Sequence, residues 1–479
     1  MQRILTVEQM KLADANTIEN LKIPSSELVE RAGEAVANEI KKLFMGGRVL
    51  VCIGKGNNGE DGKVIARILQ KEHGFNVQTI NIVNGVFQIF EKKFDIIVDC
   101  IFGIGLNREV EGKYKKAIEL INKSGAFVVA CDIPSGINGN TGLVMGSAVK
   151  ANLTIAIQEL KLGHFLNSGK EYCGKIIAKD IGISIWEEDC AKCLTEEDVK
   201  EFFPKRKQNS HKGNFGKVAI IGGSKEFSGS VILSHMALSA LKMGTGYSVL
   251  AIPNCIYDSV SAVHPEITYC IMGNKTNQLE FDEDKLKDLM QYSALAIGMG
   301  MGVSQENYKI LSYILDNYKG KLLIDADGLN NLAKFGLEPL KSAKCEVALT
   351  PHVGEFARLT GLDKNHILLN MQQCATEFAK KWGVCLIVKN AVSLITDGER
   401  VVYNTTGNSG LAKGGSGDML SGLCLGLMCR SEDVMLSLSV ASFILGKTAE
   451  KCSQKINEYS ITPTDILNTL PFVVNEFCN

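Results

Sequence analysis

Glycine, asparagine and carboxylate residues are concentrated in one nine-residue stretch, GKGNNGEDG at residues 54–62. The stretch follows an apolar run and precedes a helical pattern, the context in which a helix N-terminus binds an anion through its backbone N–H groups. Its glycines match the G-x-G-x-x-G spacing, but the end of the next apolar run, at residues 81–84, lacks the carboxylate that a dehydrogenase uses to hold a ribose. Asn57, Asn58 and Asp61 instead indicate coordination by side chains, beyond a simple phosphate cradle.

Two further stretches place a carboxylate directly after an apolar run: DCIFGIG, which begins at Asp99, and DIPSGI, which begins at Asp132. Ligands of open parallel sheets bind at the carboxyl ends of the strands, so we expect both loops to meet the first glycine loop. Asn58, Asp99 and Ser135 carry hard oxygen donors that suit a cation. Asp132 is then available to transfer a proton at a substrate. The alternative is that the two aspartates only cap turns.

A second glycine-rich stretch, GNSGLAKGGSGD, ends at Asp418 and leads into an apolar run at residues 419–429. Five glycines in twelve residues let backbone N–H groups turn towards an anion, and the dipole of the following helix favours negative charge there. Asp418 is placed to act as a base for a substrate hydroxyl, as in-line phosphoryl transfer requires. Because no Gly-Lys-[Ser/Thr] ends the stretch, it is not a Walker loop. The alternative is a glycine turn with Asp418 as a helix cap.

Four more loops of the C-terminal half follow apolar runs and carry glycine or polar residues. Their sequences are GMGMG at residues 298–302, DADGLN at 325–330, TPHVGEF at 350–356 and IVKNA at 387–391. Because the carboxyl ends of parallel strands share one edge of a sheet, we expect these loops to gather around Asp418. His352 on its own is equally consistent with a structural histidine.

Alternating strand and helix patterns surround both sets of loops. In the N-terminal half they predict helices at residues 26–44 and 61–72 and strands at residues 48–53, 77–83, 95–101, 126–133 and 153–157. In the C-terminal half a strand begins at Lys217, and others are predicted at residues 295–297, 322–325, 347–349, 386–388 and 392–395. This alternation indicates the α/β class, with two doubly wound three-layer α/β/α domains. The two domains are predicted to be joined near residues 190–210, and the basic stretch at residues 205–213 is predicted to be a solvated linker.

Composition and charge exclude several classes of protein. The 479 residues contain 52 Lys and Arg against 53 Asp and Glu, a net charge of −1 that gives no electrostatic reason to expect nucleic acid or an anionic membrane as a partner. The most apolar runs are shorter than the roughly 18 residues that span a bilayer, and no signal-peptide pattern opens the sequence. The 15 cysteines are spread singly, which indicates reduced thiols and a cytoplasmic protein.

The stretches GKGNNGEDG, DCIFGIG and DIPSGI together resemble the NAD(P)H-hydrate epimerase family, over about residues 1–190. The resemblance implies a Rossmann-like domain at residues 1–192 that interconverts the R and S hydrates at C6. It implies that Asp132 is catalytic and that Asn58, Asp99 and Ser135 bind potassium. The residues implied to contact the hydrate are Asn57, Asn58, Gly59, Glu60, Asp61, Gly103, Ile104, Gly105, Leu106, Asn107, Arg108, Glu109 and Asp132. Glu60 stands where the family usually has glycine, which adds a carboxylate to the loop.

The C-terminal loops, with HKGNFGKVAIIGGS at residues 211–224 and His264-Pro-Glu266, resemble the ribokinase-like NAD(P)H-hydrate dehydratases over about residues 195–479. The resemblance implies a ribokinase-like domain at residues 193–479 in which ADP or ATP phosphorylates the C6 hydroxyl of the S hydrate and phosphate elimination restores the nicotinamide double bond. Asp418 would be the catalytic base. The implied hydrate-binding residues are Gly302, His352, Val353, Gly354, Glu355, Phe356, Ala357, Arg358 and Asp418. The implied nucleotide-binding residues are Lys389, Asn390, Ala391, Val392, Ser393, Asn408, Ser409, Gly410, Leu411, Ala412, Lys413, Gly414, Gly415, Ser416 and Gly417.

The two resemblances also imply the partners of the protein. These are the small molecules NADHX or NADPHX and ADP or ATP, with Mg²⁺ bound to the nucleotide; we expect a homo-oligomer, and neither nucleic acid nor a membrane. The leading hypothesis is therefore a bifunctional metabolite-repair enzyme, both isomerase and lyase. The alternative is a ribokinase-like kinase for a vitamin precursor or sugar, joined to a non-catalytic N-terminal binding module.

Overall fold

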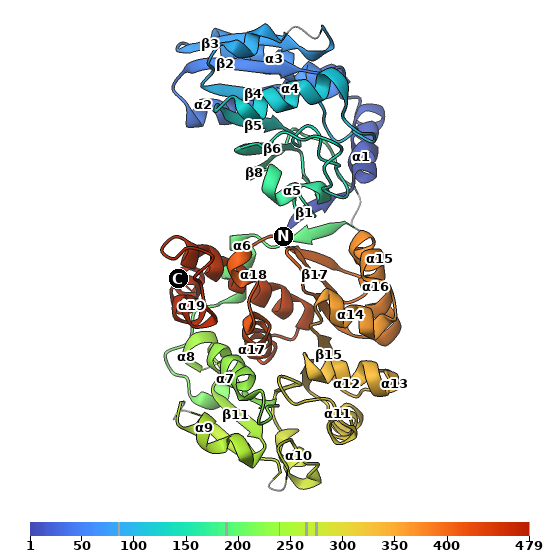
Figure 1. The fold of residues 1–479 in the computed structure, drawn as a ribbon, viewed down its shortest axis with the longest axis vertical. Helices are drawn as coiled ribbons and strands as arrows, with labels where there is room; N and C mark the ends of the chain where they lie inside the picture. Colours follow the sequence, from blue (N-terminus) through green and yellow to red (C-terminus); the bar gives the residue numbers. More distant parts are fainter. Residues whose placement is uncertain (85–86, 187–189, 239, 264–266, 274–275, 479) are drawn as a thin grey trace. The chain divides into compact units, whose positions relative to one another are not determined.

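The computed structural model describes residues 1–84, 87–186, 190–238, 240–263, 267–273 and 276–478 (Figure 1). The chain divides into two compact units, an N-terminal unit at Gln2–Ala191 and a C-terminal unit at Lys192–Asn479. The motif His264-Pro-Glu266 lies outside the described residues. Within the described ranges, no helix combines the length and the hydrophobicity that a membrane span requires.

The N-terminal unit is built on a six-stranded parallel sheet with the order β3-β2-β4-β5-β6-β8. Its strands are β2 (Gly47–Ile53), β3 (Phe75–Asn81), β4 (Ile96–Cys100), β5 (Phe127–Cys131), β6 (Leu153–Ile157) and β8 (Lys175–Lys179). Five of them match the predicted strands to within a few residues. The sequence does not predict β8, because its KIIAK segment is only half-buried and has a three-residue apolar core.

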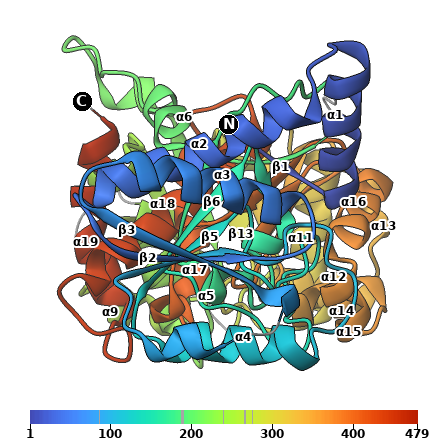
Figure 2. The same cartoon turned by 90° about the horizontal axis from the view of Figure 1, so that it is seen from above.

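Helices cover both faces of this sheet, as Figure 2 shows for β2 and β3 between α2 and α3 on one side and α4 on the other. In β2, Val49 and Val51 pack against α2 (Ser25–Leu43) and α3 (Asn57–Lys71), whereas Leu50 packs against α4 (Gly112–Lys123). Alternate strand residues point to opposite faces, so an unbroken apolar strand such as β2 must be buried on both. The carboxyl ends of the strands remain uncovered for the loops that carry the polar side chains.

Short elements complete the N-terminal unit. β1 (Gln2–Leu5) pairs with β7 (Leu160–Lys161), and α1 (Val7–Asn20) begins with a capping box formed by Thr6 and Gln9. A 3₁₀ turn, Leu162–His164, and α5 (Gly169–Tyr172) follow β7. These elements bring the segment after β6 to the same edge of the sheet as the glycine loop.

The C-terminal unit contains a longer sheet with the order β12-β11-β10-β13-β14-β15-β16-β17-β18-β9. The pairs from β12 to β16 are parallel, and the β16–β17 and β17–β18 pairs are antiparallel. The strands are β9 (Ala191–Cys193), β10 (Lys217–Ile221), β11 (Tyr247–Ile252), β12 (Thr268–Ile271), β13 (Ala294–Ile297), β14 (Lys321–Ile324), β15 (Glu346–Leu349), β16 (Cys385–Val388), β17 (Ser393–Thr396) and β18 (Val401–Asn404).

Two groups of helices flank this sheet (Figure 1). One group consists of α7 (Ser228–Leu238), α17 (Ser416–Met428), α18 (Val434–Ser453) and α19 (Pro463–Phe477), and the other of α11 (Gln305–Asn317), α12 (Asp327–Phe335), α14 (Val353–Thr360) and α16 (Met371–Trp382). The remaining helices are α6 (Glu196–Phe202), α8 (Ala240–Met243), α9 (Tyr257–Ser261), α10 (Glu283–Leu289), α13 (Glu338–Lys341) and α15 (Lys364–Leu369).

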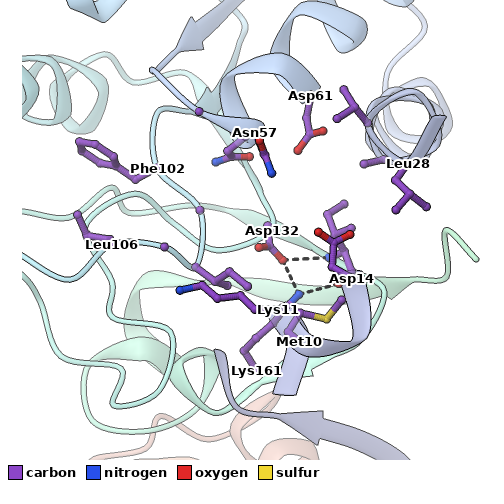
Figure 3. Close-up of a pocket in the computed structure, with 18 of the residues that line it drawn as sticks. Met10, Lys11, Asp14, Leu28, Asn57, Asp61, Phe102, Leu106, Asp132 and Lys161 are labelled. Carbon is purple, nitrogen blue, oxygen red and sulfur yellow. Dashed lines mark hydrogen bonds and ion pairs between the residues drawn. The ribbon is translucent and has the colours of Figure 1, made fainter. Parts of the chain in front are cut away.

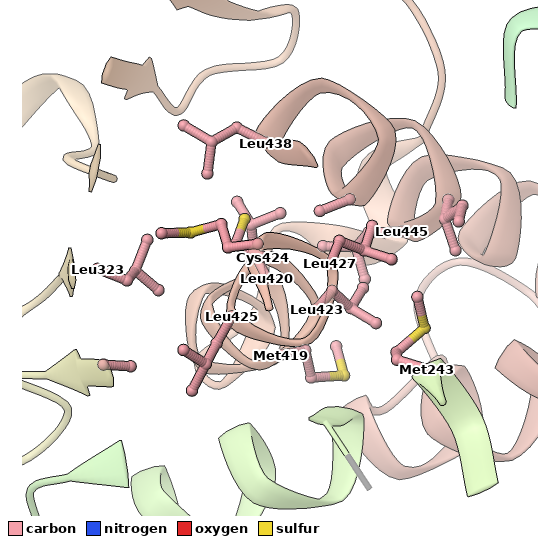
Figure 4. Close-up of a cluster of buried hydrophobic side chains, with 14 of the residues drawn as sticks. Met243, Leu323, Met419, Leu420, Leu423, Cys424, Leu425, Leu427, Leu438 and Leu445 are labelled. Carbon is pink, nitrogen blue, oxygen red and sulfur yellow. The ribbon is translucent and has the colours of Figure 1, made fainter. Parts of the chain in front are cut away.

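Helix α17 lies at the centre of the C-terminal core, because residues 419–428 are all buried. Figure 4 shows Leu323 of β14 on one side of α17 and Leu438 and Leu445 of α18 on others. A helix that is apolar all around must be enclosed by protein. Enclosure of α17 fixes its N-terminus, and with it the position of Asp418.

The basic stretch at residues 205–213 is exposed, as predicted, but it does not join the two units. The chain divides at Ala191, and α6 precedes the stretch within the C-terminal unit. The interpretation of this stretch as the linker is therefore wrong. A charged surface segment and a domain linker have similar compositions, and only the packing of α6 shows that this stretch lies inside the C-terminal unit.

Candidate active sites

A cavity of about 520 Å³ opens at the carboxyl edge of the N-terminal sheet, beside the loops that follow β2, β4 and β5 (Figure 3). Met10 and Asp14 of α1 and Leu28 of α2 form another wall, and Lys161 lies at its base. Small-molecule sites in proteins enclose roughly 300–1,000 Å³. The cavity therefore has the size and the mixed apolar and polar lining of a site for an organic ligand.

The glycine loop between β2 and α3 is closely packed. A Cβ on Gly54 would stand 1.9 Å from the carbonyl oxygen of Ile101, and one on Gly59 would stand 2.3 Å from the carbonyl oxygen of Gly54. Both positions therefore require glycine for contact between backbone segments. This packing places Asn57 and Asn58, in the first turn of α3, on the cavity wall.

Glu60 does not face the cavity. Its side chain is 54% exposed, and its carboxylate pairs with Lys63 at 2.7 Å on the solvent side of α3. The additional carboxylate of this loop is therefore directed away from the ligand space.

A buried polar group lies at the end of β4. Asp99 Oδ1 accepts a hydrogen bond from Ser135 Oγ at 2.6 Å, its Oδ2 accepts one from Ser135 N at 2.8 Å, and burial raises the pKa of Asp99 to about 6. Phe102 N–H donates to Ser135 Oγ at 2.8 Å, and the next residue, Gly103, lies against Asn58. Both amide atoms of Asn58 are buried without a hydrogen-bond partner among the residues described. The unpartnered amide oxygen of Asn58 is a hard donor of the kind that binds an oxygen-ligated cation.

Asp132 is held by contacts on both its backbone and its carboxylate. Its φ of +68° is unusual for a residue other than glycine, and its carbonyl oxygen lies 2.8 Å from His164 Nε2. Asp132 Oδ1 accepts hydrogen bonds from Lys161 Nζ at 2.5 Å and from Ile157 N at 3.2 Å. Its Oδ2 is 3.7 Å from the position that a Cβ on Gly103 would take, on the cavity side.

Asp61, another carboxylate of the cavity, has a different environment from Asp132. Asp61 takes part in none of the ion pairs found among the described residues, and burial, followed by the charge of Asp132, raises its pKa to about 8. Asp132 has the Lys161 ammonium as its partner. The two carboxylates therefore differ in their partners, because a cation contacts Asp132 but none of the ion pairs of the described residues includes Asp61.

The structure brings most of the predicted epimerase residues to one cavity. Those that line it are Asn57, Asn58, Asp61, Gly103, Ile104, Gly105, Leu106, Asn107, Arg108 and Asp132. Gly59, Glu60 and Glu109 do not line it: Gly59 packs against Gly54, and the Glu109 carboxylate lies beside Gly146.

Lys161 is the main residue of this site that the sequence reasoning missed. Its signal is a lysine four residues after the buried strand β6, close to the carboxyl edge of the sheet. Asp14 and Met10 are also missed, because no local pattern shows which sheet edge α1 covers.

The candidate C-terminal site is centred on Asp418, the third residue of α17. Gly415, at a φ of +92°, precedes the helix and makes the turn into it. Burial raises the pKa of Asp418 to about 7, and the charge of Asp325 adds to this, whereas Lys389 and the Ser230 hydroxyl act in the opposite direction. A carboxylate that titrates near neutral pH at a helix N-terminus is suited to general base catalysis.

Lys389 is brought to the N-terminus of α17 by a buried network. Its Nζ donates to Asp325 Oδ1 at 2.9 Å, and Asp325 Oδ2 accepts from Ser421 Oγ at 2.5 Å. Lys389 Nζ is also 3.4 Å from the position of a Cβ on Gly417. The ammonium and the helix N–H groups therefore lie together, as a phosphate-binding site requires.

The loop after β15 joins this network. His352 Nδ1 accepts hydrogen bonds from Gly354 N and Glu355 N, at 2.9 and 3.2 Å, so it caps α14. The Glu355 carboxylate accepts a hydrogen bond from His352 N at 2.8 Å and lies 4.0 Å from Lys389 Nζ. His352 thus has the structural role of a cap while its half-exposed ring stands beside the charged pair.

Gly302 is tied to the predicted hydrate-binding loop through polar side chains. Its N–H donates to Asp327 Oδ2 at 2.9 Å, and Asp327 Oδ1 accepts from Asn330 Nδ2 at 3.1 Å. Asn330 Oδ1 in turn accepts from Arg358 Nε at 3.1 Å.

Three predicted site residues point elsewhere. Phe356 is fully buried against Phe378, and Val392 is buried in the core. The Lys413 ammonium is bound to the carbonyl oxygens of Tyr459 and Ile461, so it does not extend freely from the glycine loop. A contiguous sequence range inevitably includes side chains that alternate between a site and the core.

Comparisons with known proteins match both units of the chain. A family model described as NAD(P)H-hydrate dehydratase matches residues 218–472, and one described as YjeF-related protein N-terminus matches residues 25–86 and 82–163. The chain is 32% identical to a bifunctional NAD(P)H-hydrate repair enzyme of Coxiella burnetii, over 95% of this chain and 96% of that protein.

Solved structures resemble the C-terminal part. An ADP/ATP-dependent NAD(P)H-hydrate dehydratase of Bacillus subtilis, crystallised with ATP and Mg²⁺, matches with 27% identity and a TM-score of 0.52, over 60% of this chain and 99% of that one. A ribokinase-like superfamily protein of Enterococcus faecalis matches with a TM-score of 0.53 and 23% identity, over 61% of this chain and 98% of that one, and supports the fold alone. The predicted α/β class with a ribokinase-like C-terminal part is confirmed.

Proposed function

The chain belongs to the family of bifunctional NAD(P)H-hydrate repair enzymes, and on that premise we propose which of the two reactions each unit catalyses. The N-terminal unit interconverts the R and S hydrates, and the C-terminal unit dehydrates the S hydrate at the expense of ADP or ATP. One observation carries this proposal: the chain contains two separate acid–base sites, Asp132 paired with Lys161 beside a cavity, and Asp418 at a glycine-flanked helix N-terminus.

We assign proton transfer in the N-terminal site to Asp132. C6 of the hydrate carries a hydroxyl and is bonded to the ring nitrogen. Removal of the hydroxyl proton by Asp132 lets the C6–N bond open to a carbonyl, and its electron pair moves to the nitrogen. Attack by the nitrogen on the other face of the carbonyl, with return of the proton from Asp132, gives the opposite epimer. The sequence of steps balances without an oxidant or a co-reactant.

Asn58, Asp99 and Ser135 are proposed to hold potassium. The assignment is supported by the oxygen donors of all three side chains and by the buried, unpartnered amide of Asn58. A bound monovalent cation would supply positive charge to oxygen atoms of the ligand. The residues themselves fix the loop after β4 against the loop after β5, through the hydrogen bonds between Asp99 and Ser135.

In the C-terminal site we assign Asp418 as the base for the C6 hydroxyl of the S hydrate. As Asp418 takes the proton, the hydroxyl oxygen attacks the terminal phosphoryl group of the nucleotide. The bond from that group to the nucleotide breaks, and the nucleotide is released with one phosphate fewer. Phosphate then departs from C6 with its bonding electrons while a proton leaves C5, and the ring double bond forms. Lys389 and the N–H groups at the start of α17 would bind the transferred phosphoryl group. Mg²⁺ would enter with the nucleotide and neutralise part of its charge.

The pKa of Asp418, raised to about 7, predicts the pH dependence of the dehydratase. The base must be deprotonated to act, so kcat/KM for the S hydrate should be constant above about pH 7 and fall about tenfold per pH unit below it. Initial rates of NADH formation across pH 5.5 to 9, in a constant-ionic-strength buffer, measure this profile. A profile that is flat down to pH 5.5 would contradict the assignment of Asp418.

A product analysis tests the proposed function against the alternative of a small-molecule kinase. We expect one inorganic phosphate for each reduced nicotinamide that is formed from the S hydrate, with no stable phosphorylated product. The measurement combines a phosphate assay with absorbance of the reduced nicotinamide in the same reaction. Accumulation of a phosphorylated compound, without phosphate release, would favour the kinase.

The remaining expectations stay predictions. The small-molecule partners are NADHX, NADPHX and ADP or ATP, and a homo-oligomeric state and a cytoplasmic location are expected from the sequence reasoning given above.

A further inference from the structure

We infer that Lys161 is a positioning residue of the epimerase, which orients the Asp132 carboxylate for proton transfer. The inference rests on the proposed epimerase function of the N-terminal unit. It deepens that function, because it assigns a role to a residue outside the three motifs that identify the unit.

The burial of Lys161 is the first observation. Its side chain is 1% exposed, although an ammonium group is costly to remove from water unless it is paired. Its Nζ has two partners, Asp132 Oδ1 at 2.5 Å and the carbonyl oxygen of Ile157 at 2.6 Å. A lysine that served only solubility would not occupy such a position, so its place at the base of the cavity indicates a specific electrostatic task.

The segment that carries Lys161 also fixes the backbone of Asp132. His164 Nδ1 accepts a hydrogen bond from Lys161 N at 3.0 Å, so its Nε2 carries the proton and donates to the Asp132 carbonyl oxygen at 2.8 Å. Burial, assisted by the charge of Lys161, lowers the pKa of His164 to about 4, which keeps the ring neutral. Asp132 has a φ of +68°, a conformation that persists in such a residue only when its surroundings hold it.

These contacts leave one carboxylate oxygen for the substrate. Oδ1 of Asp132 is occupied by Lys161 and Ile157, whereas Oδ2 is on the cavity side near Gly103. Asp61, in the same cavity, forms no such ion pair within the described part of the chain. Lys161 therefore distinguishes Asp132 from Asp61 and directs one oxygen of Asp132 into the ligand space.

Lys161→Met is the first test. In the full chain we expect kcat for the R hydrate to fall about 100-fold with KM within about twofold of its original value, because misplacement of a reacting group by about 1 Å can cost that much. Turnover of the S hydrate by the C-terminal unit should stay unchanged. Lys179→Met is the matched control, since Lys179 forms an ion pair with Glu39 in the same unit without contact to Asp132; it should leave both activities unchanged. Lys161→Gln, which keeps a hydrogen-bond donor, replaces Lys161→Met if that variant does not fold.

A double variant separates positioning from a direct or merely structural role. If Lys161 acts through Asp132, the Asp132→Asn/Lys161→Met chain should be no slower with the R hydrate than Asp132→Asn alone. Multiplicative losses would overturn the inference, as would a Lys161→Met chain with unchanged kcat. If the original chain itself fails to exchange the two epimers, the proposed function is overturned instead, so the two failures are distinguishable.

Discussion

Replacing Asp418 by asparagine is expected to lower turnover of the S hydrate by about 10²- to 10⁴-fold, the range that loss of a positioned general base produces. Asparagine matches aspartate in size but cannot accept the hydroxyl proton. The expected loss is in kcat, because Lys389 and the N-terminus of α17 still bind the phosphate groups. Stopped or continuous assays of NADH formation from purified S hydrate, at saturating nucleotide, measure it.

Asp433→Asn is the matched control for this variant. Asp433 is also a carboxylate at a helix N-terminus of the C-terminal unit, where it caps α18 and pairs with Arg400. Asparagine is an equally good cap, so we expect near-original activity. Exchange between the R and S hydrates should persist in Asp418→Asn. If Asp418→Asn retains more than about a tenth of the original kcat, Asp418 is not the base.

Asp132→Asn is expected to abolish enzymatic exchange of the epimers, again by about 10²- to 10⁴-fold, while recovery of NADH from the S hydrate continues at its original rate. The proton acceptor is lost, and the Lys161 ammonium is left beside a neutral amide. With a mixture of both hydrates, NADH should therefore form in two phases: a fast phase for the S fraction and a slow phase at the rate of spontaneous exchange.

Asp95→Asn provides the control for the N-terminal unit. Asp95 pairs with Arg48 near the amino ends of β2 and β4, the opposite edge of the sheet from Asp132. Its replacement should leave the single fast phase intact. A binding module without catalytic activity would give the same two-phase curve for the original chain and for Asp132→Asn, so this experiment also tests the non-catalytic alternative.

The sequence predicts the parts of the fold that local patterns determine. Apolar runs such as 48–53 and 153–157 predict β2 and β6, and the loops at Asp99 and Asp132 follow from the rule that ligands bind at carboxyl ends of parallel strands. Short or half-buried strands such as β8 lack a clear alternation or run of apolar residues, so the sequence does not predict them.

Contacts between distant segments explain what the sequence could not predict in the sites. Lys161 reaches Asp132 across 29 residues of sequence, and Ser421 reaches Asp325 across 96. No local pattern encodes either pair. Phe356 shows the converse limit. It lies inside a matching motif but faces the core, because successive side chains of a helix point in different directions around its axis.

The most direct test of the central claim follows reduced-nicotinamide absorbance after the full chain is added to mixed R and S NADH hydrate, with potassium, Mg²⁺ and either ADP or ATP. The two-site account predicts complete recovery of NADH from both epimers, faster than their spontaneous exchange. Recovery of the S fraction alone would contradict the epimerase role of the N-terminal unit, and no recovery with either nucleotide would contradict the repair function as a whole.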